Sequence, residues 1–441
     1  MNGIPQYVEE ILKTLEQAGY EAWCVGGCVR DLLLERTPQD WDVTTSARPE
    51  ETMAVFDGRS LPTGLRHGTV TVRQGTERVE VTTFRLDGVY RDHRRPETVA
   101  FTDSLVEDLR RRDFTVNAMA MDRRGNIRDP FGGREDLQNG VLRCVGAPEA
   151  RLREDALRIL RGLRFSACLG LSPETETAAA LHRCGILLAD IAPERIWGEL
   201  SRLLEGDWAP QVLREFPDVL AVFWPEISAM VGFDQHSRHH CYDVWEHTLH
   251  ALSVLPPDRL LRCTMLLHDV GKPGCFVQDA SGSGHFPGHP ERGAVMAEKM
   301  LRRLRVDNRT TETVVCLVRW HDRNIPRTRP GIRRALAELG EENLRRLLEI
   351  KRADNLAQAS QDLLGEIRRA EEILDGLAAE GACVSLRQLA VRGNDLAALG
   401  LKGAGVGQML RLLLNAVLDE AVANERTALM QYARKSMEET R

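Results

Sequence analysis

The sequence contains no long apolar segment and no recognisable targeting signal. None of its apolar runs approaches the length of about 18 residues that a helix needs to cross a membrane. The first residues also lack the basic, apolar and small-residue order of a signal peptide. They instead space apolar side chains as on one face of a helix, namely Ile4, Val8, Ile11, Leu12 and Leu15. We therefore expect a cytoplasmic protein that has no membrane partner.

Paired C-x-x-C clusters are also absent. The ten cysteines are scattered along the chain, which argues against a disulfide framework or a zinc knuckle and indicates buried, reduced thiols. Internal repeats and low-complexity segments are missing as well. A chain of 441 residues with 43% hydrophobic and 28% charged residues is expected to form about two to four globular domains.

The chain has no general excess of positive charge. Its formal net charge is −6, which argues against a protein that coats nucleic acid indiscriminately. Arginines nevertheless gather in short clusters, such as residues 110–112 and 302–305, and such clusters permit local recognition of RNA. A solvated helix face is the alternative explanation of each cluster. The balance fits a protein that binds one structured RNA transiently.

The periodicity of the first 140 residues predicts a mixed α/β head. Residues 68–73 and 78–84 alternate apolar and polar side chains around a Gly-bearing turn, which predicts a β-hairpin. We expect the hairpin to share one sheet with strands at residues 22–25 and 41–45.

Beyond residue 140 the strand pattern almost disappears, and the chain reads as a long helical body. Helices are predicted, for example, at residues 155–168, 194–204 and 292–304. The fold class is therefore α+β. The expected domains are a head at residues 1–140, a helical neck at 141–225, a histidine-bearing domain at 226–356 and a helical tail at 357–441.

The segment from Gly26 to Asp42 carries the strongest chemical signal. Its paired glycines follow an apolar strand and let backbone N–H groups approach a phosphate chain, and the next helix carries Arg30. Asp40 and Asp42 are two residues apart, so on a short strand they point to one face and can converge on Mg²⁺. A surface Asp-x-Asp is the alternative, which the upstream glycines and Arg30 disfavour. Magnesium ligands beside a triphosphate cradle predict nucleotidyl transfer.

Two further head segments offer groups for the same nucleotide. Glu80, on a neighbouring predicted strand, is a candidate third carboxylate, and a solvent-facing residue is the alternative. Residues 109–118 contain three arginines followed by Asp113 and Asn117 at the start of a helix, which suits phosphate and ribose recognition. A basic helix start without a ligand is the alternative there.

Asp155, Arg158 and Arg161 are spaced by three, so a helix would present them on one face. A carboxylate that accepts from an amino group beside an arginine that donates to a ring nitrogen would select cytosine and adenine over uracil and guanine. A salt-bridged surface helix is the alternative. Arg164 continues the spacing but has turned away from Asp155, and we include it among the candidate nucleotide-binding residues.

The helical body holds a second group of chemically active side chains. An adjacent histidine and aspartate end an apolar helix, and further histidines lie about one helical hairpin away on either side. Imidazoles and carboxylates gathered from separate helices suit a transition-metal site. The candidate ligands are His247, His268, Asp269, His289, His321 and Asp354.

The head segments resemble, in order, those of the class II CCA-adding tRNA nucleotidyltransferases of the polymerase β superfamily. The resemblance is carried by residues 26–31, 40–42, 111–118, 129–133 and 154–161. It implies a polymerase β-like head in which protein side chains select the incoming nucleotide. The implied roles are Mg²⁺ binding by Asp40 and Asp42, triphosphate binding by Gly27 and Arg30, sugar contact by Arg112, and base recognition by Asp155, Arg158 and Arg161.

The histidine group resembles that of HD-type metal-dependent phosphohydrolases. On this resemblance His247, His268, Asp269 and Asp354 are the core ligands, and His289 and His321 match the extra histidines of two-metal members. The resemblance implies a site for Mn, Ni, Fe or Co, with Lys272 facing a phosphate. The complete ligand set favours hydrolytic activity.

The predicted function is the addition of C, C and A to the 3′ end of tRNA from CTP and ATP. Residues 87–96 resemble the flexible loop that supports the switch from C to A addition, which favours the full reaction, and the resemblance implies a tail that braces the tRNA. The alternatives are a poly(A) polymerase, a nucleotidyltransferase that adds only CC or only A, and a metal phosphohydrolase whose head only binds RNA. No oligomeric state is predicted.

Overall fold

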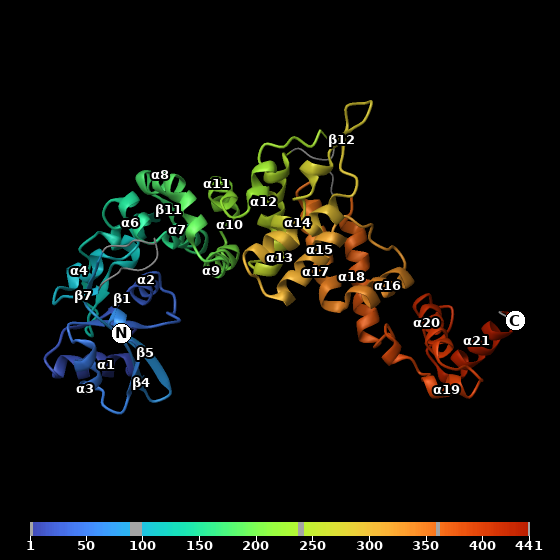
Figure 1. Cartoon of the computed structure of the whole chain (residues 1–441), viewed down its shortest axis with the longest axis horizontal. Coiled ribbons are helices and arrows are strands. Elements are labelled where there is room, and N and C mark those ends of the chain that lie inside the picture. The colour runs from blue at the N-terminus through green and yellow to red at the C-terminus, as the bar shows by residue number, and fades with distance from the viewer. Residues whose placement is uncertain (1–2, 89–98, 237–241, 359–361, 440–441) are drawn as a thin grey trace. The chain divides into compact units, whose positions relative to one another are not determined.

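The computed structural model describes residues 3–88, 99–236, 242–358 and 362–439 (Figure 1). The chain divides into two compact units, the first formed by residues 1–228 and 303–306 and the second by residues 229–302 and 307–441. Within the described residues, no helix is both long enough and apolar enough to span a membrane.

The first unit begins with a seven-stranded sheet in the order β3-β4-β5-β2-β1-β8-β9. β1 is antiparallel to both β2 and β8, whereas β2 is parallel to β5. The predicted hairpin is confirmed as β4 and β5, and it shares the sheet with β1 and β2 as expected. The strands are β1 (Ala22–Val25), β2 (Asp42–Thr45), β3 (Ser60–Gly64), β4 (Thr69–Gln74), β5 (Glu77–Thr83), β8 (Ala120–Met121) and β9 (Ile127–Arg128).

Alternation of side chains fixes which face of this sheet is covered. Val79 and Val81 of β5 are buried, whereas Glu80 between them is exposed on the other face. The predicted N-terminal helix is α1 (Gln6–Gln17), which contacts β1 and β4, and α3 (Pro49–Val55) contacts β3, β4 and β5. α1 buries Val8, Ile11, Leu12 and Leu15.

Helices complete the first unit. In the head, short helices follow β1 and precede β8, and beyond them α7 lies in contact with α8, α9 and α10. The described helices are α2 (Gly27–Leu33), α4 (Leu105–Arg110), η2 (Thr115–Asn117), α5 (Gly133–Gln138), α6 (Pro148–Glu154), α7 (Leu157–Leu169), α8 (Thr175–Cys184), α9 (Pro193–Leu204), α10 (Ala209–Glu215) and α11 (Pro217–Ala221).

In its described residues, the second unit is helical apart from a two-stranded hairpin, β12 (Val277–Gln278) and β13 (Gly284–His285). α12, α13 and α17 contact one another, and α15 packs against α13 and α17. One apolar core lies among α15 to α18, and a separate core lies among the C-terminal helices. The helices are α12 (Val244–Val254), α13 (Arg259–Leu267), α14 (His289–Arg303), α15 (Asn308–Trp320), α16 (Arg329–Leu339), α17 (Glu341–Leu356), α18 (Leu364–Ala379), α19 (Gly393–Ala397), α20 (Ala404–Leu418) and α21 (Arg426–Glu439).

Two local predictions were wrong. Asp40 does not share a strand with Asp42, because the last residue pair of β1 and β2 is Val25 with Asp42 and β1 then turns at Gly26, whose φ is 78°. Asp155 does not lie on the helix with Arg158. It is extended, with φ −135° and ψ 104°, between α6 and α7.

The Asp155 side chain explains the break between α6 and α7. Its Oδ1 accepts a hydrogen bond from the N–H of Leu157, the first residue of α7, at 3.1 Å. Aspartate competes in this way with helical backbone bonds, so it favours the start of a helix over its interior.

Candidate active site and metal cluster

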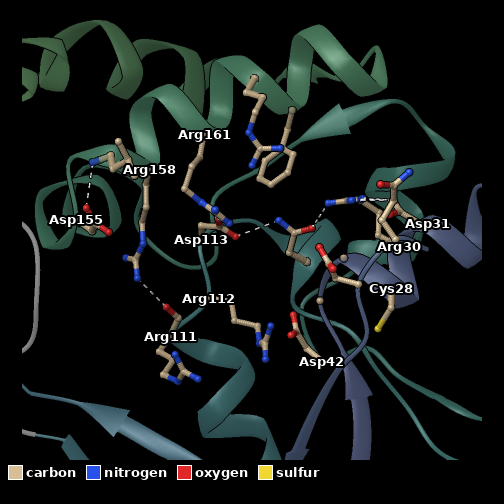
Figure 2. A pocket seen from close by; sticks show the side chains of 18 of the residues that line it. Cys28, Arg30, Asp31, Asp42, Arg111, Arg112, Asp113, Asp155, Arg158 and Arg161 are labelled. Atoms are coloured by element: carbon tan, nitrogen blue, oxygen red, sulfur yellow. Dashed lines mark hydrogen bonds and ion pairs between the residues drawn. The ribbon is translucent and has the colours of Figure 1, made fainter. Parts of the chain in front are cut away.

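A cavity of about 480 Å³ lies in the first unit, between the glycine turn after β1 and helix α7 (Figure 2). Apart from Glu80, it contains the residues that the sequence singled out as nucleotide or magnesium ligands in the first unit. Those lining residues are Gly27, Arg30, Asp40, Asp42, Arg112, Asp155, Arg158, Arg161 and Arg164.

Two carboxylates, Asp40 and Asp42, line the strand edge of this cavity, and a third, Glu80, lies beside Asp42 in the sheet. Asp42 at the start of β2 pairs in register with Glu80 of the parallel strand β5, so both side chains lie on the same face of the sheet. Burial raises the pKa of Asp42, and Glu80 and Asp40 raise it further, whereas Arg112 lowers it. Asp42 keeps solvent contact through the cavity. Clustered carboxylates that repel one another fit Mg²⁺, which prefers oxygen ligands and relieves the repulsion.

A buried carboxylate holds the two arginines beside this cluster. Asp108 is fully buried and accepts hydrogen bonds from Nε and Nη2 of Arg111 at 3.0 and 2.8 Å, and Arg112 Nη2 lies 3.6 Å from it. Burial alone would raise the pKa of Asp108, but the two guanidinium groups lower it. A Cβ atom on Gly26 would lie 2.9 Å from Arg112 Nη1, so the glycine leaves the arginine its place.

Asp155 and Arg158, which are expected to select the base, are each held by another protein group. Arg195 Nη2, from α9, lies 3.4 Å from Asp155 Oδ2. The guanidinium of Arg158 is bonded to the carboxylate of Glu154 and reaches the main-chain oxygen of Arg111 at 3.0 Å (Figure 2). A neutralised guanidinium acts as a directed hydrogen-bond donor more than as a point charge.

A line of polar contacts crosses the cavity from α7 to α2 (Figure 2). Arg161 donates to Asp113 Oδ2 from Nε at 2.8 Å, Asn117 joins Asp113 to Arg30, and Arg30 also binds Asp31. Although burial alone would raise it, Arg161 and Arg158 hold the pKa of Asp113 well below its usual range. Asp113 therefore stays ionised and keeps Arg161 in place.

Phe165 provides a shared surface for three guanidinium groups. Those of Arg30, Arg161 and Arg164 lie 5.2, 5.3 and 4.2 Å from its ring centre. Arg164 is further bound by Glu199 of α9 at 2.5 Å. Arg164 is thus held by an aromatic ring and a carboxylate.

In the second unit, the six predicted ligands come together as two adjoining groups. His247, His268 and Asp354 form one group, and Asp269, His289 and His321 form the other. Within each group, one potential ligand atom per residue lies within 4.8 Å of the others.

Asp269 lies between the two groups. Its Oδ2 is 3.1 Å from His268 Nε2, and its Oδ1 is 3.5 Å from Nε2 of both His289 and His321. In the first group, His247 Nε2 is 2.8 Å from Asp354 Oδ1. One carboxylate can therefore serve two cations.

The hydrogen bonds around this cluster fix the histidines for metal binding. Nδ1 of His268, His289 and His321 pairs with a main-chain oxygen at 2.7, 2.9 and 2.6 Å respectively. If Nδ1 carries the proton, the lone pair of Nε2 faces the cluster, as in metal-ligating histidines. Among the described residues, His268 Nε2 and Asp269 Oδ1 are buried without a well-directed hydrogen bond. The donor set fits one or two transition-metal ions.

The charges around His268 also favour a bound cation. Burial alone would lower its pKa, but the Asp269 and Asp354 carboxylates raise it to about 10. The pocket therefore favours a cation, either a proton or a metal, between these carboxylates. Lys272, expected to face a phosphate, is buried and lies with Nζ 2.6 Å from Asp269 Oδ2 and 2.9 Å from Gln235 Oε1.

Several residues of the head site were missed by sequence reasoning. Arg195 and Glu199 of α9 line or support the cavity from a segment with no motif, although their i, i+4 spacing places them on one helix face. The spacing of Asp108 to Arg111 and Arg112 was a visible signal of the same kind. The predicted flexible loop at residues 87–96 lies, from residue 89, outside the described residues.

Three family models match parts of the chain. The Poly A polymerase head domain matches residues 22–143, the HD domain matches residues 238–359, and a family described as the probable RNA and SrmB-binding site of polymerase A matches residues 170–230. The first and second of these families are metal-dependent.

Curated relatives match about half of the chain. The CCA-adding enzyme of Geobacillus thermodenitrificans is 51% identical over 203 residues, which are 46% of this chain and 50% of the relative. That of Oceanobacillus iheyensis is 43% identical over 263 residues, or 59% of this chain and 64% of the relative. The chain thus spans about half the length of the first of these relatives.

Solved structures match along nearly the whole chain. The CCA-adding enzyme of Bacillus stearothermophilus in complex with CTP is 30% identical, with a TM-score of 0.76 over 99% of this chain and 98% of that chain. The Thermotoga maritima CCA-adding enzyme complexed with tRNA is 17% identical, with a TM-score of 0.62 over 98% and 96%, which supports the fold alone. The polymerase β-like head and helical body with an HD domain are confirmed.

Proposed function

This chain belongs to the family of CCA-adding enzymes, and from that membership we propose that it adds C, C and A to the 3′ end of tRNA. The donors are CTP and ATP, and pyrophosphate is released at each step. The single observation that carries the proposal is that candidate magnesium, triphosphate and base ligands line one cavity. A poly(A) polymerase is disfavoured, because the match along nearly the full length is to an enzyme named for CCA addition.

The head carboxylates are proposed as the magnesium site. Asp40 and Asp42 are the main ligands, and Glu80 is proposed as a third because it pairs in register with Asp42. Magnesium held there would lower the pKa of the tRNA 3′-hydroxyl and neutralise the leaving pyrophosphate. Gly27 and Arg30 hold the triphosphate, so that its α-phosphate faces the 3′-hydroxyl in line.

Nucleobase selection is proposed to rest on Asp155 together with Arg158 and Arg161. The Asp155 carboxylate accepts from the amino group that cytosine and adenine share, and an arginine donates to the adjacent ring nitrogen. Arg112 contacts the sugar. Arg164 supports this wall through Phe165 and Glu199 rather than reading the base itself.

The test uses a tRNA transcript that ends before CCA. With CTP alone we expect two added nucleotides, and with CTP and ATP together we expect three. ATP alone should add nothing to this transcript. Long A tails would establish a poly(A) polymerase, and a product that stops after two C residues would establish a CC-only enzyme. If no C is added to this transcript but A is added to a second transcript that already ends in CC, the chain would be an A-only enzyme.

A second activity is proposed for the HD domain. The observation that favours it is the complete set of six ligands in two groups joined by Asp269. Such a site holds one or two ions of Mn, Ni, Fe or Co and would hydrolyse phosphoesters. The activity should require added transition metal and disappear in His268→Ala. Hydrolysis that persists in this variant would refute the assignment.

The proposed division of labour follows the chain. The head at residues 1–140 performs nucleotidyl transfer, and the neck at 141–225 selects the base. The HD domain at 226–356 holds the second metal site, and the tail at 357–441 braces the tRNA.

A further inference from the structure

Asn117 lies between the two ends of the head cavity. It is the last residue of η2 and is almost fully buried, with 5% of its surface exposed. Its Nδ2 donates to Asp113 Oδ1 at 3.2 Å, and its Oδ1 accepts from Arg30 Nη1 at 2.7 Å. One neutral side chain therefore touches both a carboxylate and a guanidinium.

The orientation of the Asn117 amide is fixed by these partners. A carboxylate only accepts and a guanidinium only donates, so the opposite orientation would set acceptor against acceptor and donor against donor. Both bonds involve an ionised partner, which makes them stronger than bonds between neutral groups. The amide thus links its neighbours in one defined geometry.

The two partners of Asn117 belong to the regions proposed to bind the base and the triphosphate. Asp113 holds Arg161, with Nη2 at 2.7 Å from its Oδ2, on the base-selecting helix α7. Arg30 belongs to α2, beside the glycine turn proposed to hold the triphosphate. A shift of Arg161 would pull on Asp113 and Asn117 and so alter the position of Arg30.

We propose that Asn117 is a positioning residue that couples base recognition at Arg161 to triphosphate binding at Arg30. A base that fits Arg161 leaves the line of contacts intact, and Arg30 then holds the triphosphate in line with the 3′-hydroxyl. A base that displaces Arg161 disturbs Arg30 and slows the transfer. Selectivity is then expressed in the rate of the chemical step as well as in binding. The inference rests on the proposed nucleotidyl transfer.

Phe165 offers a rival route between the same two arginines. The guanidinium groups of Arg30 and Arg161 lie at similar distances from its ring, 5.2 and 5.3 Å. Contact with an aromatic face tolerates sliding, whereas the bonds of Asn117 do not. The experiment must therefore separate the polar route from the aromatic one.

The first measurement compares kcat and KM for single additions from CTP and UTP by the full chain. Asn117→Leu has nearly the same size but makes neither bond. We expect kcat with CTP to fall about tenfold, within the range of coupling between linked sites, while KM and the slow UTP reaction change little. Asn126→Ala, in an exposed turn of the same head, should leave all constants unchanged. An equal loss with CTP and UTP, or no loss, would overturn the proposal.

The second measurement is a double-mutant cycle between Arg30→Lys and Arg161→Lys. Their effects on kcat with CTP should be non-additive in the natural chain and additive in the Asn117→Leu background. Coupling that survives Asn117→Leu but disappears in Phe165→Leu would assign the link to the ring and refute Asn117. If Asn117→Leu unfolds at the assay temperature, Asn117→Ser replaces it, because its hydroxyl is too short to reach both partners.

These outcomes are distinct from failure of the proposed function. If the unmodified chain adds no C to the transcript, the proposed function itself is wrong. If it adds C normally and the cycle is additive from the start, only the role of Asn117 is wrong.

Discussion

The head cavity and the HD cluster are both candidate metal sites, and they differ in how much of the ligand set the protein itself supplies. The HD cluster gathers six side chains, of which His247, His268 and Asp269 are at most 1% exposed. The head offers carboxylates at the edge of an open cavity of about 480 Å³. Mg²⁺ commonly takes its remaining ligands from water and substrate phosphates, whereas transition metals favour imidazole from the protein.

The two sites also differ in which protein groups hold their side chains in place. The HD cluster is ordered by main-chain oxygens that face three imidazole Nδ1 atoms, before any substrate arrives. The head is ordered by ion pairs among its own lining residues, such as Arg161 with Asp113. We expect metal binding in the HD cluster to be independent of nucleotide, and metal binding in the head to depend on it.

The largest effect is expected from Asp42→Ala. Loss of this proposed magnesium ligand should remove several kcal/mol of transition-state stabilisation, or about a thousandfold in the rate of the proposed C addition. Metal-dependent phosphoester hydrolysis should be unchanged. The rate of C addition is measured as a single turnover on the truncated tRNA. The matched control is Asp57→Ala, because Asp57 is an exposed residue of the head. Loss of both activities would mean that the two sites are not separate.

His268→Ala is expected to have the complementary effect. Added Mn²⁺ should stabilise the natural chain by about 2.7 kcal/mol at a hundred times its Kd, and this gain should vanish in the variant. C addition should continue at the natural rate. Thermal unfolding with and without Mn²⁺ tests this, with His285→Ala in the exposed β12–β13 hairpin as the control. A retained shift in Tm would place the ion elsewhere.

Asp113→Asn tests how much the ion pair between Asp113 and Arg161 stabilises the head. Removal of the charge that holds Arg161 is expected to cost about 2 kcal/mol of unfolding free energy at neutral pH. The folded-state pKa of Asp113 is lowered, so its contribution is complete above the unfolded-state value of about 3.9 and is lost as the pH falls below it. Urea unfolding at pH 7 and pH 3 should therefore show a smaller difference between variant and natural chain at pH 3. An equal difference at both pH values would exclude a charge effect.

The smallest effect is expected from Lys351→Met. Lys351 is buried, and its Nζ donates to the main-chain oxygens of His321 and Arg323 at 2.5 Å each. Without these bonds His321 is held less firmly, so affinity for an ion at the Asp269 group should fall about tenfold. Calorimetric titration with Mn²⁺ measures this affinity. The exposed Lys299→Met should bind as the natural chain does, and an unchanged isotherm for Lys351→Met would show that His321 needs no such support.

Local patterns in the sequence were sufficient for most of the secondary structure. The β4–β5 hairpin and α1 follow directly from alternation and from the spacing of apolar residues. The break before α7 was missed because periodicity treats Asp155 as one more helical position. Its side chain instead bonds to the N–H of Leu157, and this local competition decides where the helix begins.

The sequence predicted which residues line the candidate site, but not which hydrogen bonds and ion pairs hold them in place. Asp40, Asp42, Arg158 and Arg161 were singled out and do line one cavity. The group that holds each one often comes from far along the chain, as with Asp113 for Arg161 and Asn117 for Arg30. Such pairs depend on how the segments pack, and no spacing within a single segment encodes them.

The lining of the head cavity also has a consequence for charge balance. It includes seven arginines and five aspartates. Three further carboxylates behind the lining, those of Asp108, Glu154 and Glu199, pair with four of the arginines and remove the positive excess. Bound Mg²⁺ would make the pocket positive again and so favour a nucleoside triphosphate, which carries roughly four negative charges. Metal and nucleotide are thus favoured as a pair, and departure of both with pyrophosphate would restore the empty pocket for the next pair, as the proposed repeated addition to one RNA end requires.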